Sequence, residues 1–173
     1  MGTIWRRTQP ALTYATAAHA AVGQMRKYTD EPYIVHPIRV GDIVDKFGGT
    51  DEMIMAAYLH DVVEDTAVSI DNIQDMFGPV VARIVDGLTD VSVPEDGNRA
   101  VRKAKDRAHS AEASYEAQFV KCADIIDNAS DIGDHDPSFN VVYRLEMFRL
   151  LEVLDKVKDT LIYEAAINAV TLK

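Results

Sequence analysis

Apolar residues recur along this chain at spacings of three and four, which is the pattern of helices that each bury one face. No segment shows the strict alternation of a half-buried strand. Glycine, proline and capping residues separate the periodic segments. The pattern predicts helices over residues 10–27, 37–47, 51–65, 69–77, 79–88, 114–132, 138–160 and from 161 onward, with an exposed loop over 91–98. We therefore expect an all-α fold.

Two of these helices carry further expectations. The first is predicted to end with Arg26 and Lys27 in its last turn, where their charges complement the helix dipole. Near the end of the chain, a stripe of large apolar residues is predicted to face the core: Leu145, Phe148, Leu151, Leu154 and Val157.

The stretch Y-L-H-D-V-V-E-D-T at 58–66 places ionisable residues inside an apolar helix. At about 100° per residue, four of them fall on one flank: His60, Asp61, Glu64 and Asp65. One turn earlier the same flank carries Met53, Ile54 and Ala57, which indicates that it faces the core, while Val62 and Val63 point away. Buried carboxylates are costly unless they are paired or bind a metal, so this flank favours a cation site.

Composition narrows the possible partners. At 173 residues the chain suits one domain, taken as residues 1–173, that buries a core without disulfides. The formal net charge of −10 argues against nucleic acid as a partner, because a phosphate backbone requires a basic surface. The single cysteine, Cys122, has apolar neighbours and is predicted to be buried. One cysteine cannot form an internal disulfide, which fits a protein of a reducing compartment. No apolar run reaches the ~18 residues of a membrane span, and we expect a soluble cytoplasmic protein.

Two further residues complete a candidate metal site with His60 and Asp61. His36 precedes Pro37 at the predicted start of a helix, and Asp124 lies inside the apolar run F-V-K-C-A-D-I-I-D-N. Two imidazoles and two carboxylates suit Mn²⁺, Fe²⁺, Co²⁺ or Zn²⁺ better than Mg²⁺ or Ca²⁺. Four protein ligands leave positions open for water and substrate.

This chemistry predicts hydrolysis of a phosphoester or pyrophosphate, because such an ion activates water and polarises a phosphoryl oxygen. Glu64 and Asp65, one turn beyond the ligands, are placed to orient the water or move its proton. One basic cluster stands out in the acidic chain, and it is either a solvated helix face or a binding surface for an anionic substrate. Its members are Arg99, Arg102, Lys103, Lys105 and Arg107.

These motifs resemble a known family, the HD-domain metallo-phosphohydrolases, and within it the RelA/SpoT-type hydrolases of guanosine 3′-diphosphate alarmones. The matching stretches are G-Q-M-R-K at 23–27, E-P-Y-I-V-H-P at 31–37, A-A-Y-L-H-D-V-V-E-D-T at 56–66, F-G-P-V-V-A-R-I-V-D-G-L-T at 77–89 and V-K-C-A-D-I-I-D-N at 120–128. Together they extend in family order over about two thirds of the chain. The likeness is to the small stand-alone form, the metazoan SpoT homologue.

The resemblance implies a role for each site residue. It implies that Mn²⁺ is bound by His36, His60, Asp61 and Asp124. Glu64 and Asp65 would be the catalytic pair acting on the 3′-pyrophosphate, with GDP or GTP and pyrophosphate as products. Contacts to the nucleotide substrate are implied for a further set: Arg26, Lys27, Arg99, Asn128 and Arg144.

Three departures from the family pattern concern the pocket wall. The family's A-D-K-L-H-N, or its form with Y-N, appears here as A-D-I-I-D-N, and Phe148 stands where the small enzymes have tyrosine. Two extra residues separate His19 from Gln24, where the family has H-A-G-Q. Two alternatives therefore stay open. One is hydrolysis of another nucleotide, such as the 2′-phosphate of NADPH or a dNTP, and the other is an HD domain that binds nucleotide without catalysis.

Overall fold

The structure is a computed structural model that describes residues 4–171. Within this range the only β-type pairing is an isolated bridge between Met25 and Pro32. The α-helices are α1 (Ile4–Ala21), α2 (Val35–Lys46), α3 (Asp51–Leu59), α4 (Val62–Asp65), α5 (Ile70–Leu88), α6 (Arg99–Glu112), α7 (Tyr115–His135), α8 (Pro137–Leu151) and α9 (Leu161–Val170), with 3₁₀ turns η1 (Pro94–Asp96) and η2 (Asp155–Val157). The predicted all-α fold is confirmed.

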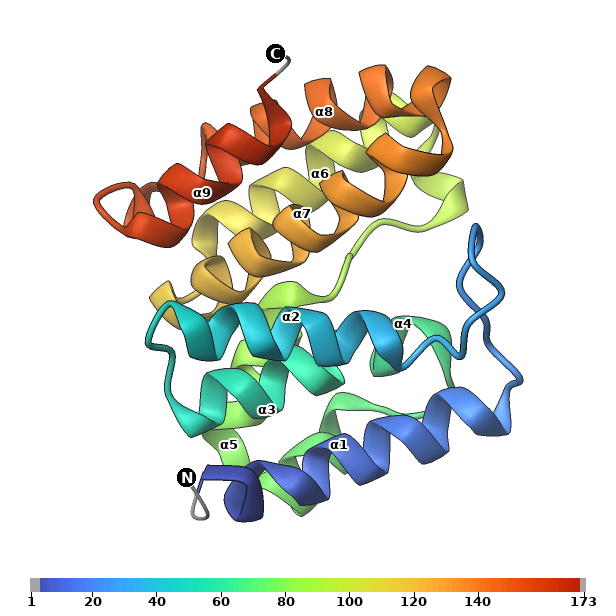
Figure 1. Cartoon of the computed structure of the whole chain (residues 1–173), viewed down its shortest axis with the longest axis vertical. Coiled ribbons are helices and arrows are strands. Elements are labelled where there is room, and N and C mark those ends of the chain that lie inside the picture. Colours follow the sequence, from blue (N-terminus) through green and yellow to red (C-terminus); the bar gives the residue numbers. More distant parts are fainter. Residues whose placement is uncertain (1–3, 172–173) are drawn as a thin grey trace.

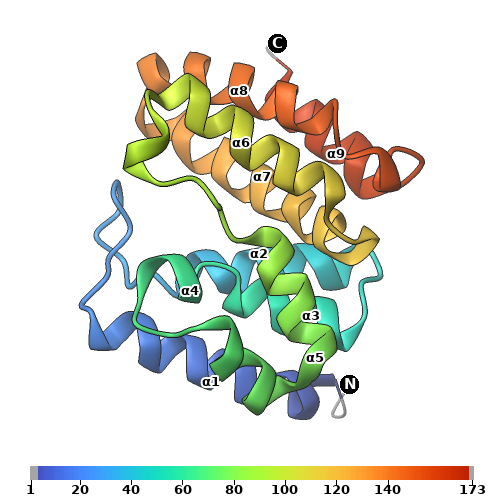
Figure 2. The same ribbon diagram turned by 180° about the vertical axis from the view of Figure 1, so that it is seen from behind.

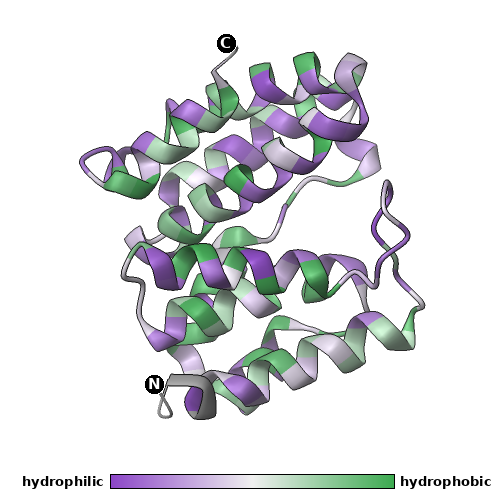
Figure 3. Cartoon of the chain, viewed as in Figure 1, coloured by the Kyte–Doolittle hydropathy of each residue, from purple (hydrophilic) through white to green (hydrophobic). Residues whose placement is uncertain are grey.

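Helix α7 lies between two groups of helices (Figure 1). It packs on α2, α3 and α5 on one side and on α8 and α9 on the other. The reverse view shows α6 beside α7 and α8 (Figure 2). Most helices carry both hydrophilic and hydrophobic segments (Figure 3), as expected for elements that bury one face. No helix of residues 4–171 is long and apolar enough to cross a membrane.

Local sequence explains several helix ends. The Thr50 hydroxyl accepts a hydrogen bond from the Met53 amide (3.3 Å), and Ser69 and Asn72 cap each other's backbone. Helices α3 and α5 therefore begin within one residue of their predicted starts. Gly78 adopts a φ of 86° just before Pro79 and kinks α5 at the predicted break. The helix that contains Asp124 continues to His135, beyond the predicted end at 132.

The predicted continuous helix over 51–65 is wrong. Helix α3 ends at Leu59, and α4 begins at Val62 after a turn whose Asp61 has φ −97° and ψ −5°. This turn rotates the following residues, so Val62 is fully buried while Glu64 and Asp65 are exposed. The four ionisable residues therefore do not share one buried flank, and only the first two are carried inward.

Helix α1 ends six residues before the predicted Lys27 terminus. Gly23 adopts a φ of 64° and ends the helix with a left-handed turn. Arg26 and Lys27 then lie in a loop that is held by the hydrogen bond from the Arg26 amide to the Glu31 carbonyl (2.8 Å). The predicted helix-dipole contact of these two residues is therefore wrong.

The predicted C-terminal apolar stripe is only partly buried. Leu151, Leu154 and Val157 are buried, but Leu145 and Phe148 are 54% and 44% exposed. A single helical stripe fails here because α8 ends at Leu151 and the chain turns through η2. Cys122 is fully buried as predicted, and burial raises the pKa of its thiol to about 12.

Candidate functional site

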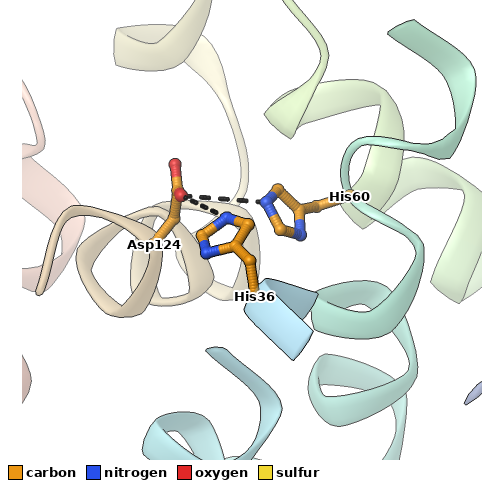
Figure 4. A group of neighbouring side chains, drawn as sticks. All are labelled: His36, His60 and Asp124. Atoms are coloured by element: carbon orange, nitrogen blue, oxygen red, sulfur yellow. Dashed lines mark ion pairs between the residues drawn. The ribbon is translucent and has the colours of Figure 1, made fainter. Parts of the chain in front are cut away.

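Three segments that are distant in sequence bring His36, His60 and Asp124 together (Figure 4). His36 lies in the first turn of α2, His60 follows α3, and Asp124 projects from α7. One ligand atom of each lies within 4.8 Å of the others. Asp124 Oδ1 is 3.2 Å from His36 Nε2 and 3.7 Å from His60 Nε2.

Asp61 adds a second carboxylate to this cluster. Its Oδ2 lies 3.0 Å from His60 Nε2 and 3.7 Å from His36 Nε2. The Tyr33 hydroxyl donates a short hydrogen bond to the same oxygen. The fourth residue predicted as a metal ligand therefore adjoins the cluster through its contacts with both imidazoles.

The hydrogen bonds of both imidazoles determine which nitrogen faces the cluster. His60 Nδ1 lies 2.7 Å from the Ala57 carbonyl, which only accepts, so this nitrogen carries the proton. His36 Nδ1 likewise lies 2.7 Å from Asp127 Oδ2. In the neutral rings each Nε2 therefore presents a lone pair, and within residues 4–171 the buried Nε2 of His60 has no hydrogen-bond partner.

Two lone pairs and two carboxylates that converge in this way repel one another unless a cation lies between them. The donor set of two nitrogens and two oxygens fits a divalent transition-metal ion. The hydrogen bonds from the outer groups hold the rings in the orientation that such an ion requires. These residues therefore form a candidate metal centre.

The charges of the cluster support the same conclusion. Burial alone would lower the pKa of His36, but hydrogen bonds to Asp124 and Asp127 raise it to about 9. Although burial opposes ionisation of Asp61, the two imidazoles lower the pKa of its carboxyl. The site thus attracts positive charge strongly, as a proton or as a metal ion.

A cavity of about 220 Å³ opens beside the cluster. Asp61, Asp124 and Asn128 line it on the metal side, and α6 and α8 form its opposite walls. Asn128 Nδ2 donates to Asp124 Oδ1 (2.6 Å), which ties a predicted substrate contact directly to a predicted ligand.

The proposed catalytic acids point in different directions. Glu64 lines the cavity, and its Oε1 accepts a hydrogen bond from the Asp90 amide (2.6 Å). Partial desolvation in the cavity wall raises the pKa of Glu64 to about 7, although the residue as a whole is exposed. Asp65 does not line this cavity, and its Oδ2 instead accepts from Gln24 Nε2 (2.8 Å).

The predicted basic contacts are dispersed over the surroundings of the cluster. Arg26 is buried in a short ion pair with Asp131, and it lines a second cavity of about 340 Å³ together with Lys27 and Asn128. Arg99 lines a third cavity, of about 420 Å³.

Two of the predicted substrate-binding residues, Arg99 and Arg144, form hydrogen bonds with other protein groups. Arg99 Nε and Nη2 each donate to the Glu146 carboxylate at 2.7 Å. Arg144 bonds Asn140 and the Thr171 carbonyl, and it lines none of these three cavities.

Sequence reasoning missed three residues of the site. Asp127 orients His36, Tyr33 holds Asp61, and the Lys121 ammonium lies 3.4 Å from Asp124 Oδ2. Helical spacing could have predicted two of them, because Lys121 and Asp127 lie one turn to either side of Asp124. Tyr33 lies before α2, where no periodicity predicts its direction.

The all-α fold and the candidate metal centre together indicate the class of protein. Residues 11–139 match the HD-domain family, and the chain belongs to this family. The resemblance inferred from the motifs is thereby confirmed.

Particular relatives narrow the comparison. The guanosine-3′,5′-bis(diphosphate) 3′-pyrophosphohydrolase MESH1 of Drosophila melanogaster is 38% identical over 130 residues, which are 73% of this chain and 70% of that protein. MESH1 of Danio rerio is 42% identical over 61% of this chain and 58% of its own length. A probable enzyme of the same name from Synechocystis is 44% identical over 47% of this chain but only 10% of that protein.

Solved structures agree with the fold. A metazoan orthologue of SpoT that hydrolyses ppGpp superposes with a TM-score of 0.80 at 27% identity, covering 95% of this chain and 93% of the other. A protein from Listeria monocytogenes EGD-e has a TM-score of 0.65 at 21% identity and supports the fold alone.

Proposed function

We propose that this protein is a divalent-metal-dependent hydrolase that removes the 3′-pyrophosphate of guanosine alarmones, converting ppGpp or pppGpp to GDP or GTP and pyrophosphate. The observation that carries the proposal is the convergence of two imidazole lone pairs and two carboxylates beside a cavity. The activity named for the MESH1 relatives supports the choice of substrate. Because this alarmone is an intracellular nucleotide, we propose a cytoplasmic location.

His36, His60, Asp61 and Asp124 would hold the ion. When bound there, a divalent metal lowers the pKa of water and polarises a phosphoryl oxygen. The donor set suits Mn²⁺, Fe²⁺, Co²⁺ and Zn²⁺ alike, and we propose Mn²⁺ because of the family resemblance.

Glu64 is the proposed general base. Its carboxylate lines the cavity near the ligands, and a pKa near 7 matches proton transfer at neutral pH. Asp65 is proposed to orient the attacking water from the other side, held by Gln24. In this arrangement the two acids act from different directions on the same centre.

The nucleotide is proposed to lie along the cavities that border the metal cluster. Asn128 lines two of them and is placed to contact the nucleoside, with Arg26 and Lys27 beside it. Arg99 is proposed to bind phosphate from the third cavity. Arg144 is proposed as a further phosphate contact, which requires it to leave the Thr171 carbonyl.

The test is a substrate panel with protein loaded with Mn²⁺. Release of pyrophosphate from ppGpp, with little turnover of NADPH or dNTPs, is the expected result. Turnover of NADPH or a dNTP instead would replace the substrate and keep the metal chemistry. A His60→Ala variant that loses both bound metal and turnover serves as the control for contaminating phosphatases.

A purified protein that binds ppGpp but neither retains transition metal nor releases pyrophosphate would support the nucleotide-binding alternative. The preserved ligand set together with a cavity-facing Glu64 speaks against that alternative, since binding alone requires neither.

A further inference from the structure

The cavity beside the metal cluster has a basic wall that the metal chemistry does not use. Helix α6 lines the cavity with Lys103, Asp106, Arg107 and Ser110, one stripe at helical spacing. Lys121 faces the same space from α7. These helices lie side by side in Figure 2. Two cations of this wall, Arg107 and Lys121, have charges that protein partners do not fully satisfy.

Of the two cations that α6 contributes to this cavity, Lys103 is paired and Arg107 is not. Arg102 also has no side-chain partner in the part of the chain that the structure describes, but it lines the third cavity instead. Lys103 Nζ lies 2.8 Å from Asp90 Oδ2, and Arg99 is engaged by both oxygens of Glu146. Over residues 4–171, the guanidinium of Arg107 takes part in no hydrogen bond or ion pair. It is half-buried, so water screens its charge less than that of a surface arginine.

Lys121 is only partly engaged. Its side chain is 15% exposed, and its one contact is the 3.4 Å approach of Nζ to Asp124 Oδ2. An ammonium has three donors, so this long contact leaves donors available to a ligand in the cavity.

A guanidinium and an ammonium that line the same cavity are the groups that a multiply charged oxyanion requires. The planar guanidinium matches two phosphate oxygens, and charge-assisted bonds of this kind are about twice as strong as neutral ones. Three acids of the cavity belong to the metal side, namely Asp61, Glu64 and Asp124. The other acids that line it are paired with Lys103 or Arg99: Asp90, Asp106 and Glu146. The basic wall is left for the anion.

We propose that Arg107 and Lys121 form an anion subsite that binds a phosphate of the pyrophosphate group and retains pyrophosphate after cleavage. The assignment of this anion rests on the proposed function. The presence of an oxyanion site in this cavity does not depend on which nucleotide is hydrolysed.

The test is binding of inorganic pyrophosphate and orthophosphate to the protein by calorimetry, at a fixed free Mn²⁺ concentration so that chelation is constant. We expect Arg107→Gln to weaken pyrophosphate binding about tenfold or more, with unchanged metal content. Arg149→Gln is the matched control, because Arg149 is exposed and lies outside this cavity. Lys121→Met should weaken binding similarly, and Lys121→Arg should restore it if the protein keeps its melting temperature.

The outcomes separate the subsite from the proposed function. Weaker pyrophosphate binding in Arg107→Gln but not in Arg149→Gln supports the subsite even if ppGpp is not a substrate. Equal binding by the wild type and Arg107→Gln, or absence of pyrophosphate binding to the wild type, overturns it. If ppGpp is hydrolysed, Arg107→Gln should also raise the inhibition constant of pyrophosphate while Arg149→Gln leaves it unchanged.

Discussion

Asp127 Oδ2 lies 2.7 Å from His36 Nδ1, and Asp127 stands one helical turn beyond Asp124 on α7. One helix therefore supplies both a proposed metal ligand and the carboxylate that orients another ligand from α2. Such outer groups set the tautomer and direction of a ligating imidazole.

Asp127→Asn should weaken metal binding about 10- to 100-fold, because the amide holds the His36 ring less firmly and no longer favours its Nδ1 proton. Titration of metal-free protein with Mn²⁺ measures the effect. Asp134→Asn is the control, since Asp134 is exposed on the same helix. Equal affinities in the wild type and Asp127→Asn would remove Asp127 from the site.

Glu64→Gln should lower the rate of alarmone hydrolysis about 10²- to 10⁴-fold while metal content is retained, because it removes the proposed general base. The wild-type rate should rise with pH through about 7, where the Glu64 carboxyl ionises. A rate that persists in Glu64→Gln would assign the base to another residue.

Although Glu64→Gln should lower the hydrolysis rate, it should raise the stability of the metal-free protein above about pH 7. Because the pKa of Glu64 is raised from 4.5 to about 7, the folded protein holds this proton more tightly than the unfolded chain. Its stabilising contribution is present below about pH 4.5 and is lost as pH rises through about 7. Metal-free Glu64→Gln should therefore match the wild type near pH 4.5 and exceed it at pH 8, by less than about 1 kcal/mol since the residue is partly solvated. Urea unfolding at both pH values tests this.

Gln24→Leu should lower kcat about tenfold with little change in KM, because it frees Asp65 from the hydrogen bond that positions it. His19 Nδ1 lies 2.7 Å from Gln24 Oε1, which holds the amide in the orientation that donates to Asp65. Gln74→Leu, an exposed change on α5, is the control. A matching loss of kcat in Asp65→Asn, without a further loss in the double variant, would establish that the two residues act together.

Gly41→Ala should destabilise the fold by about 1–3 kcal/mol, since a Cβ on this helical glycine would clash with Tyr58 Cε1 and force the ring to move. Gly133→Ala is the matched control, because its nearest neighbours lie at 3.8 Å and alanine favours the helix. Thermal unfolding of both variants measures the difference. Equal melting temperatures would mean that Tyr58 can move at little cost.

Local sequence predicted much of this molecule because helices depend on local patterns. Periodicity identified the all-α fold, capping residues such as Thr50 and Ser69 placed helix starts, and Gly78 with Pro79 marked a kink. Candidate metal ligands can also be recognised in the sequence, because histidine and aspartate residues stand out among apolar neighbours. The four proposed ligands were therefore recognisable before their three segments were seen to meet.

Tertiary structure decided what depends on contacts between distant segments. A backbone turn at Asp61 rotated Glu64 and Asp65 away from the flank of His60. Gln24, 41 residues away in sequence from Asp65, determined where the Asp65 carboxylate points. Contacts between distant segments also decide the roles of the five residues in the basic cluster, which the sequence alone could not distinguish from one another. Neighbours on α8 and in the 89–98 loop engage Arg99 and Lys103, whereas Arg107 is left facing the cavity, and no local pattern specifies those neighbours.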